Sequence, residues 1–294
     1  MKILTSIFFY GILIPISRFP FPVLYAISDG LYFFIYRVLG YRKKVVLKNI
    51  ANSFPQKSPV EHKKIMDEFY RHLCDLVVES LKVFTISEAE LHKRFVFKNP
   101  QVIDQFYDQG KNVIMALGHL NNWEMAAVAV AQSIKHQPVA LYRSFSNSFF
   151  DQKMKSSRSK YGLKMIPTRQ TWEEFEKGEG LRAIIFAFDQ SPVHVSRSYW
   201  STFLSQDTAM NFGVEKYSKK YRVPVVYGRI NKIKRGHYTF DFTEVIDAPD
   251  SEYGYITKRI FQLLEQDITA NPQFWLWSHK RWKHQRPATL EAAE

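Results

Sequence analysis

"VIMALGHLNNWEMAAVAVAQ", residues 113–132, joins a strand-like run to a helix-like run through one short turn. The apolar residues 113–117 predict a buried strand, and Gly118 allows the chain to turn at its carboxyl end. The alanine-rich run that follows predicts a helix with Asn121 as its N-cap. Ligands of open α/β sheets bind beyond the carboxyl ends of the strands, so His119 lies where a functional side chain is expected.

The rest of the chain repeats this alternation of strand-like and helix-like segments. Further strands are predicted for the short apolar runs at 138–143, 163–167, 182–190, 223–230 and 237–246. Helices are predicted between and after them, at 147–162, 171–178, 210–221 and 251–271. The sequence therefore predicts an α/β fold with a mostly parallel central sheet flanked by helices. The strict alternation in 237–246 predicts a half-exposed, antiparallel strand.

Residues 44–85 predict helices that precede the sheet. In the run that begins at Ser58, apolar residues recur at helical spacing, and Ser58, Pro59 and Glu61 form a typical helix start. Cys74 lies in this run and is predicted to be a buried packing residue. A single cysteine cannot form an intrachain disulfide, which fits a domain that faces the cytosol.

The first 40 residues are strongly apolar but interrupted. The run 3–17 is shorter than the roughly 20 residues of a comfortable spanning helix, and the run 19–36 contains two prolines and an aspartate. A basic cluster at 41–48 follows, as is typical beside the cytoplasmic leaflet. We expect an uncleaved membrane anchor at 1–40, either one short tilted span or a helical hairpin in the interface, ahead of one catalytic domain at 41–294. A buried helical hairpin is the alternative.

The composition points to anionic partners. The chain has 294 residues, 46% hydrophobic and 16% aromatic, which excludes a disordered protein. Its net charge of +13 suits nucleic acid, anionic lipid headgroups or an acidic carrier protein. The stretch 277–286 interleaves basic and aromatic residues, which suits a solvated tail, single-stranded nucleic acid or a membrane interface. The apolar N-terminus favours the membrane, and we expect no nucleic acid partner.

His119 and Glu124 can form an acid–base pair if the histidine lies in the turn and the glutamate in the first turn of the helix. A carboxylate that accepts the Nδ1 proton fixes the tautomer, and Nε2 can then take a proton from a substrate hydroxyl group. The activated hydroxyl group can attack a thioester or an ester without a protein nucleophile. The sequence has no nucleophile elbow, no glycine-rich phosphate loop and no zinc-ligand spacing, so we expect no metal or organic cofactor.

The block GHLNNWE at 118–124 resembles the signature of the lysophospholipid acyltransferase superfamily, a histidine followed after four residues by an acid. More specifically, it resembles the bacterial lipid A late acyltransferase branch. Other segments resemble that family in the same order along the chain: 47–82, 141–167, 186–192 and 271–287.

This resemblance implies an N-terminal membrane anchor, an α/β fold and transfer of a fatty acyl chain from acyl carrier protein to a hydroxyl group of a lipid A precursor. The reaction would take place at the cytoplasmic face of the bacterial inner membrane. His119 would be the general base and Glu124 its partner. The resemblance also implies a set of substrate-binding residues: Asn122, Tyr142, Arg143, Ser144, Arg158, Asp189 and Gln190.

Two members of that set have a structural alternative. Asn122 either contacts substrate or holds the turn, and Asp189 either contacts substrate or pairs with Arg143 or Arg158. The two arginines suit an anionic headgroup, because a guanidinium binds phosphate through two parallel hydrogen bonds.

One segment departs from the family pattern. Residues 191–213 keep Phe203 and Thr208 but lack the glycines that the family commonly has there. A lysophospholipid, an amino-acid lipid or a pigment is therefore an alternative acceptor. A non-catalytic membrane protein that binds anionic lipid is the alternative from another functional class.

Overall fold

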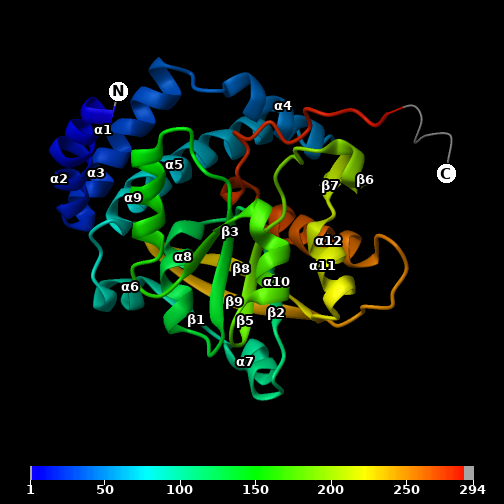
Figure 1. Ribbon diagram of the computed structural model, residues 1–294. Helices are drawn as coiled ribbons and strands as arrows, with labels where there is room; N and C mark the ends of the chain where they lie inside the picture. The colour runs from blue at the N-terminus through cyan, green and yellow to red at the C-terminus, as the bar shows by residue number, and fades with distance from the viewer. Residues whose placement is uncertain (1, 288–294) are drawn as a thin grey trace.

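A central sheet with helices on both faces forms the body of the protein (Figure 1). The computed structural model describes residues 2–287, so Met1 of the expected anchor and residues 288–294 of the expected catalytic domain lie outside the described residues. The seven strands of the sheet are β1 (Phe95–Phe97), β2 (Val113–Leu117), β3 (Gln137–Tyr142), β4 (Lys164–Pro167), β5 (Arg182–Ala187), β8 (Val225–Lys234) and β9 (His237–Ile246).

The strand order is β1-β9-β8-β2-β5-β3-β4. All neighbouring pairs are parallel except β8 and β9, which are antiparallel. The predicted α/β class with a mostly parallel sheet is therefore confirmed, and so is the antiparallel strand at 237–246. Alternate residues of β2 face two different cores: Ile114 and Ala116 face one, and Val113 and Met115 face the other. Such a strand must be apolar along its whole length, as it is.

Helices cover the two faces of the sheet. Those that follow the N-terminal segment are α4 (Lys43–Ser53), α5 (Pro59–Val83), α6 (Glu88–Arg94), α7 (Gln101–Asp108), α8 (Trp123–Ala129), α9 (Ser148–Arg158), α10 (Thr171–Lys177), α11 (Gly213–Tyr221) and α12 (Tyr255–Ala270). The predicted start of α5 is confirmed, because the side chains of Ser58 and Glu61 each bind the backbone N–H of the other. Cys74 is fully buried, as expected.

A two-stranded antiparallel sheet was not expected. Its strands are β6 (Ser198–Phe203) and β7 (Gln206–Asn211), and they lie in the segment that departs from the family pattern. The helix predicted for 210–221 begins only at Gly213, because β7 continues to Asn211. The turn of this hairpin holds Leu204 and Ser205 at φ values of 50° and 60°. Glycine or asparagine is usual at such positions, so the turn has no typical sequence signal.

The N-terminal segment forms a bent pair of helical arms. The first arm consists of α1 (Lys2–Phe8), a π-helical turn (Phe9–Leu13) and α2 (Ile14–Arg18), and the second of α3 (Phe21–Tyr32) and a π-helical turn (Phe33–Val38). In the described part of the chain, no single helix is long and apolar enough to cross a membrane, but the two arms together meet that test and bend by 119°.

One side of this hairpin packs on the body, where Leu24 and Tyr36 are buried. In Figure 1 it lies at one side of the molecule, beside α5 and α9. Its other side exposes large apolar side chains, among them Leu4, Ile7 and Phe33, which argues against the buried-hairpin alternative.

Candidate active site

The turn after β2 brings the signature block to the carboxyl edge of the sheet. Gly118 lets α12 pack closely there, because a Cβ atom would lie 2.6 Å from Cδ1 of the buried Leu264 and would displace that side chain. Asn121 has a φ of 57°, in the left-handed region that asparagine tolerates. The N-cap of α8 is therefore Asn122, one residue later than predicted, and its Oδ1 accepts the N–H of Met125 at 2.9 Å.

His119 and Asp189 form a hydrogen-bonded pair at the centre of this edge. The Nδ1 atom of His119 lies 2.6 Å from Oδ1 of Asp189, and the backbone N–H of His119 donates to Oδ2 at 2.9 Å. The register of the sheet explains this contact, because Leu117 of β2 pairs with Ala187 of β5. Two residues further along each strand, His119 and Asp189 lie side by side.

Glu124 makes a different contact from the one expected. Its two carboxylate oxygens accept hydrogen bonds from Nε and Nη2 of Arg158, at 2.8 Å and 2.5 Å. The expected Nδ1 hydrogen bond of His119 is thus made by Asp189, because Glu124 projects from α8 toward α9. The alternative pairing of Asp189 with Arg143 or Arg158 is wrong, since both oxygens of Asp189 bind other groups.

A third residue holds the carboxylate of Asp189 in place. Trp275, from the C-terminal segment, donates its indole N–H to Oδ2 of Asp189 at 2.7 Å. It also forms a β-bridge with Leu120, directly after the histidine. Sequence reasoning did not assign Trp275 a role, although it lies in one of the matching blocks.

The C-terminal stretch is not a basic tail. Trp277 and Arg281 are buried, with exposures of 0% and 2%, and His279 accepts the N–H of Ser191 at 3.0 Å. The interpretation of 277–286 as a solvated tail or membrane interface is wrong for Trp277 and Trp282. Trp277 packs on Phe54, and Trp282 packs on Phe203.

The electrostatics of the pair suit proton transfer. Burial lowers the pKa of His119, but the charge and hydrogen bond of Asp189, together with the charge of Glu124, raise this pKa above its usual 6.5. Burial alone would raise the pKa of Asp189, yet the interactions with His119 and Trp275 lower it to about 2. Asp189 is therefore anionic at neutral pH, and it stabilises the imidazolium form of His119.

The other ring nitrogen of His119, Nε2, lies on the side of the ring away from Asp189. The side chain of His119 is 17% exposed. The amide of Gln190 lies 3.2 Å from Nε2. The ring of Trp123 meets the imidazole edge to face with 5.2 Å between the ring centroids, and forms a wall beside it.

The remaining predicted residues lie in the turn after β2 and at the end of β3. Asn122 holds the turn, the second of its two alternatives, through Met125 and Glu79. Tyr142 is half-buried at the end of β3, and Arg143 and Ser144 are exposed in the loop that follows. Within the described residues Arg143 makes no side-chain hydrogen bond or ion pair, which leaves its guanidinium free for an anionic group.

Comparison with known proteins identifies the family. The sequence model of the bacterial lipid A biosynthesis acyltransferase family matches residues 2–284. The chain belongs to this family. It is therefore an acyltransferase, and the resemblance of its sequence blocks is confirmed.

Two similar proteins align with most of the chain. A lipid A biosynthesis palmitoleoyltransferase of Escherichia coli (strain K12) is 22% identical over 273 residues, which cover 90% of this chain and 87% of that protein. A lipid A biosynthesis acyltransferase of Haemophilus influenzae is 21% identical over 271 residues, which cover 90% of this chain and 85% of that protein.

Proposed function

We propose that the chain transfers a fatty acyl group from acyl carrier protein to a hydroxyl group of a lipid A precursor, with His119 as the general base. The observation that carries this proposal is the contact between His119 and the buried, anionic Asp189, because it keeps the ring proton on Nδ1 and so makes Nε2 the basic nitrogen. Family membership supports the acyl transfer and the lipid A acceptor.

The proposed reaction needs one base and no covalent enzyme intermediate. Nε2 of His119 takes the hydroxyl proton as the acceptor oxygen attacks the carbonyl carbon of the acyl thioester. The tetrahedral intermediate collapses, the C–S bond breaks, and the thiolate takes the proton from His119. Asp189 stabilises the imidazolium throughout, and Glu124 contributes its negative charge while it holds Arg158.

Two neighbouring features suit the substrates. Arg143, exposed beyond β3, is available for the phosphate of an anionic acceptor, with Tyr142 and Ser144 beside it. A pocket of about 260 Å³ opens at the same edge of the sheet, and its lining combines apolar side chains, among them Leu141, Phe188 and Val214, with a few polar ones. We place the acyl chain there, because the apolar part of this lining suits a hydrocarbon chain.

The test of this proposal is an acyl-transfer assay on membranes that contain the full chain. The donor is acyl carrier protein loaded with labelled fatty acid, and the acceptors are a lipid A precursor, a lysophospholipid, an amino-acid lipid and a pigment alcohol. Label in the lipid A precursor alone is the expected result. Label in another acceptor would show that the proposed acceptor is wrong. Transfer from acyl-coenzyme A alone would show that the proposed donor is wrong. No transfer from either donor would contradict the proposed reaction.

We also propose that residues 1–40 attach the enzyme to the inner membrane, with the catalytic domain on the cytoplasmic side. The hairpin exposes Ile7, Phe8 and Phe33 by 50% or more, and the basic cluster at 41–48 follows it. Exposed apolar side chains beside basic residues are typical of a segment that lies in the interface of an anionic membrane.

Replacing Ile7, Phe8 and Phe33 with serine is expected to weaken binding to anionic vesicles by about 10³-fold, since each apolar side chain contributes about 1.5 kcal/mol when it leaves water. Vesicle sedimentation measures this change. The matched control replaces three exposed apolar residues elsewhere: Tyr107, Trp172 and Val193. Equal losses in the two triple variants would rule out the hairpin as the anchor.

A further inference from the structure

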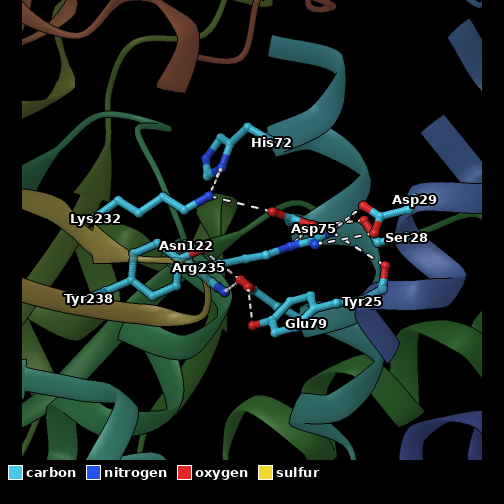
Figure 2. A network of polar contacts seen from close by, with 10 residues as sticks. All are labelled: Tyr25, Ser28, Asp29, His72, Asp75, Glu79, Asn122, Lys232, Arg235 and Tyr238. Atoms are coloured by element: carbon cyan, nitrogen blue, oxygen red, sulfur yellow. Dashed lines mark hydrogen bonds and ion pairs between the residues drawn. The ribbon is translucent and has the colours of Figure 1, made fainter. Parts of the chain in front are cut away.

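A fully buried carboxylate, Glu79 on α5, lies behind the catalytic turn. Its side chain is 0% exposed and accepts three hydrogen bonds (Figure 2). Tyr25 donates to Oε1 at 2.9 Å, and Asn122 and Tyr238 donate to Oε2 at 2.6 Å and 2.8 Å. The donors belong to α3, the N-cap of α8 and β9, so this one carboxylate joins three separate parts of the fold. A buried carboxylate is tolerated only when it is bonded in this way.

The bond from Asn122 connects Glu79 to the reaction site. The amide of Asn122 is held at both ends: Nδ2 donates to Glu79, and Oδ1 accepts the N–H of Met125. The carboxylate of Glu79 can accept a hydrogen bond only from the amide nitrogen of Asn122. It therefore turns the amide oxygen of Asn122 toward the first turn of α8. Asn122 lies between His119 and Glu124 in the chain, so its position sets the start of the helix that carries Glu124.

A second set of contacts keeps this part of α5 in place. Asp75, one turn before Glu79, accepts hydrogen bonds from Ser28 at 2.8 Å and from Arg235 at 2.6 Å. Arg235 also binds Asp29 at 2.6 Å, and Lys232 lies 3.5 Å from Asp75 (Figure 2). The N-terminal hairpin and the β8–β9 turn therefore hold α5 from two sides.

We propose that Glu79 is a positioning residue for acyl transfer: by holding the amide of Asn122, it fixes the turn between β2 and α8 and so keeps His119 in place beside Asp189. The proposal rests on the proposed function of this site. The effect passes through Asn122, since the hydrogen bonds of Glu79 go to Tyr25, Asn122 and Tyr238 and not to His119.

The test compares Glu79→Ala with Glu79→Gln in the full chain in membranes. The alanine variant is expected to lower kcat by about 10²-fold, the effect of a small displacement of reacting groups, with little change in KM for the acyl donor. The glutamine variant is expected to recover most of kcat. Its oxygen can accept from Asn122 and Tyr238, and its nitrogen can donate to the hydroxyl oxygen of Tyr25.

Glu215 provides a matched control. It is also 0% exposed, but it accepts the N–H groups of Gly254 and Thr257 at the start of α12 and not those of the catalytic turn. Glu215→Ala is expected to lower the unfolding temperature and to leave kcat per folded molecule unchanged. Equal values of kcat in Glu79→Ala and Glu215→Ala would overturn the proposal, because Glu79 would then be merely structural.

Amide hydrogen exchange tests the positioning without any substrate. The N–H of Met125 is expected to exchange faster in Glu79→Ala and Asn122→Ala, and at the wild-type rate in Glu79→Gln and Glu215→Ala. Unchanged exchange in Glu79→Ala would overturn the proposal. The double variant at positions 79 and 122 should have the kcat of Asn122→Ala, and a further multiplicative loss would also overturn it. If the wild type transfers no acyl group, the proposed function fails, and the exchange data still decide whether Glu79 holds the turn.

Discussion

Replacing His119 with alanine is expected to lower kcat/KM for acyl transfer by about 10²–10⁴-fold, which is the usual contribution of a positioned general base. The loss should be in kcat, because the imidazole takes its proton during the chemical step and contributes little to binding of the ground state. Initial rates with labelled acyl carrier protein, measured over a range of donor and acceptor concentrations, separate the two constants.

A second buried histidine gives the control for this change. His136 is 2% exposed, and its Nε2 lies 3.0 Å from the carbonyl oxygen of Lys111, at the amino end of β3. His136→Ala also removes a buried imidazole, but it should keep kcat/KM per folded molecule. If His119→Ala retained full activity, another group would have to be the base.

Replacing Asp189 with asparagine is expected to lower kcat by about 10²–10⁴-fold and also to change the pH profile. In the wild type the base must be neutral, so kcat/KM should fall as the pH drops through a pKa above 6.5. Asparagine removes the charge of Asp189, while the burial that lowers the pKa of His119 remains. The acid limb of the profile should therefore move to lower pH in this variant.

Glu124→Gln distinguishes the two carboxylates around His119. The charge of Glu124 raises the pKa of His119 less than the charge of Asp189 does, so the acid limb should move in the same direction by a smaller amount. Full pH profiles of kcat/KM for the three enzymes measure both shifts. If the acid limb moved further in Glu124→Gln than in Asp189→Asn, Glu124 and not Asp189 would be the main electrostatic partner of His119.

The position of His119 could be predicted from sequence, whereas its partner could not. An apolar run, a glycine and a capped helix are local signals, and they place the histidine at the functional edge of a sheet. The contact with Asp189 depends on β2 and β5 being neighbours, although β3 and β4 lie between them in sequence. Local patterns contain no information on that order, so they favour the nearby Glu124 over an aspartate 70 residues away.

Two further features could not be predicted from local sequence for the same physical reason. The hairpin of β6 and β7 turns through Leu204 and Ser205, whose left-handed conformation is imposed by the surrounding structure and not by residue type. In the stretch 277–286, Trp277 and Trp282 are interspersed with basic residues. Such a pattern fits a membrane interface as well as a buried extended segment, and only tertiary contacts decide between them.

The dependence of Asp189 on Trp275 has a consequence for the order of events during synthesis. A nascent chain that ends before residue 272 already contains the N-terminal helical hairpin and both His119 and Asp189. It still lacks the indole N–H of Trp275, which holds the carboxylate of Asp189. The C-terminal segment is also tied to the start of the chain, because Asn49 donates to the carbonyl oxygens of Trp277 and His279. Contacts between such distant segments form late in folding. If residues 1–40 attach the enzyme to the membrane as proposed, attachment can precede the end of translation, whereas the carboxylate of Asp189 is held by Trp275 only after the last segment has folded back.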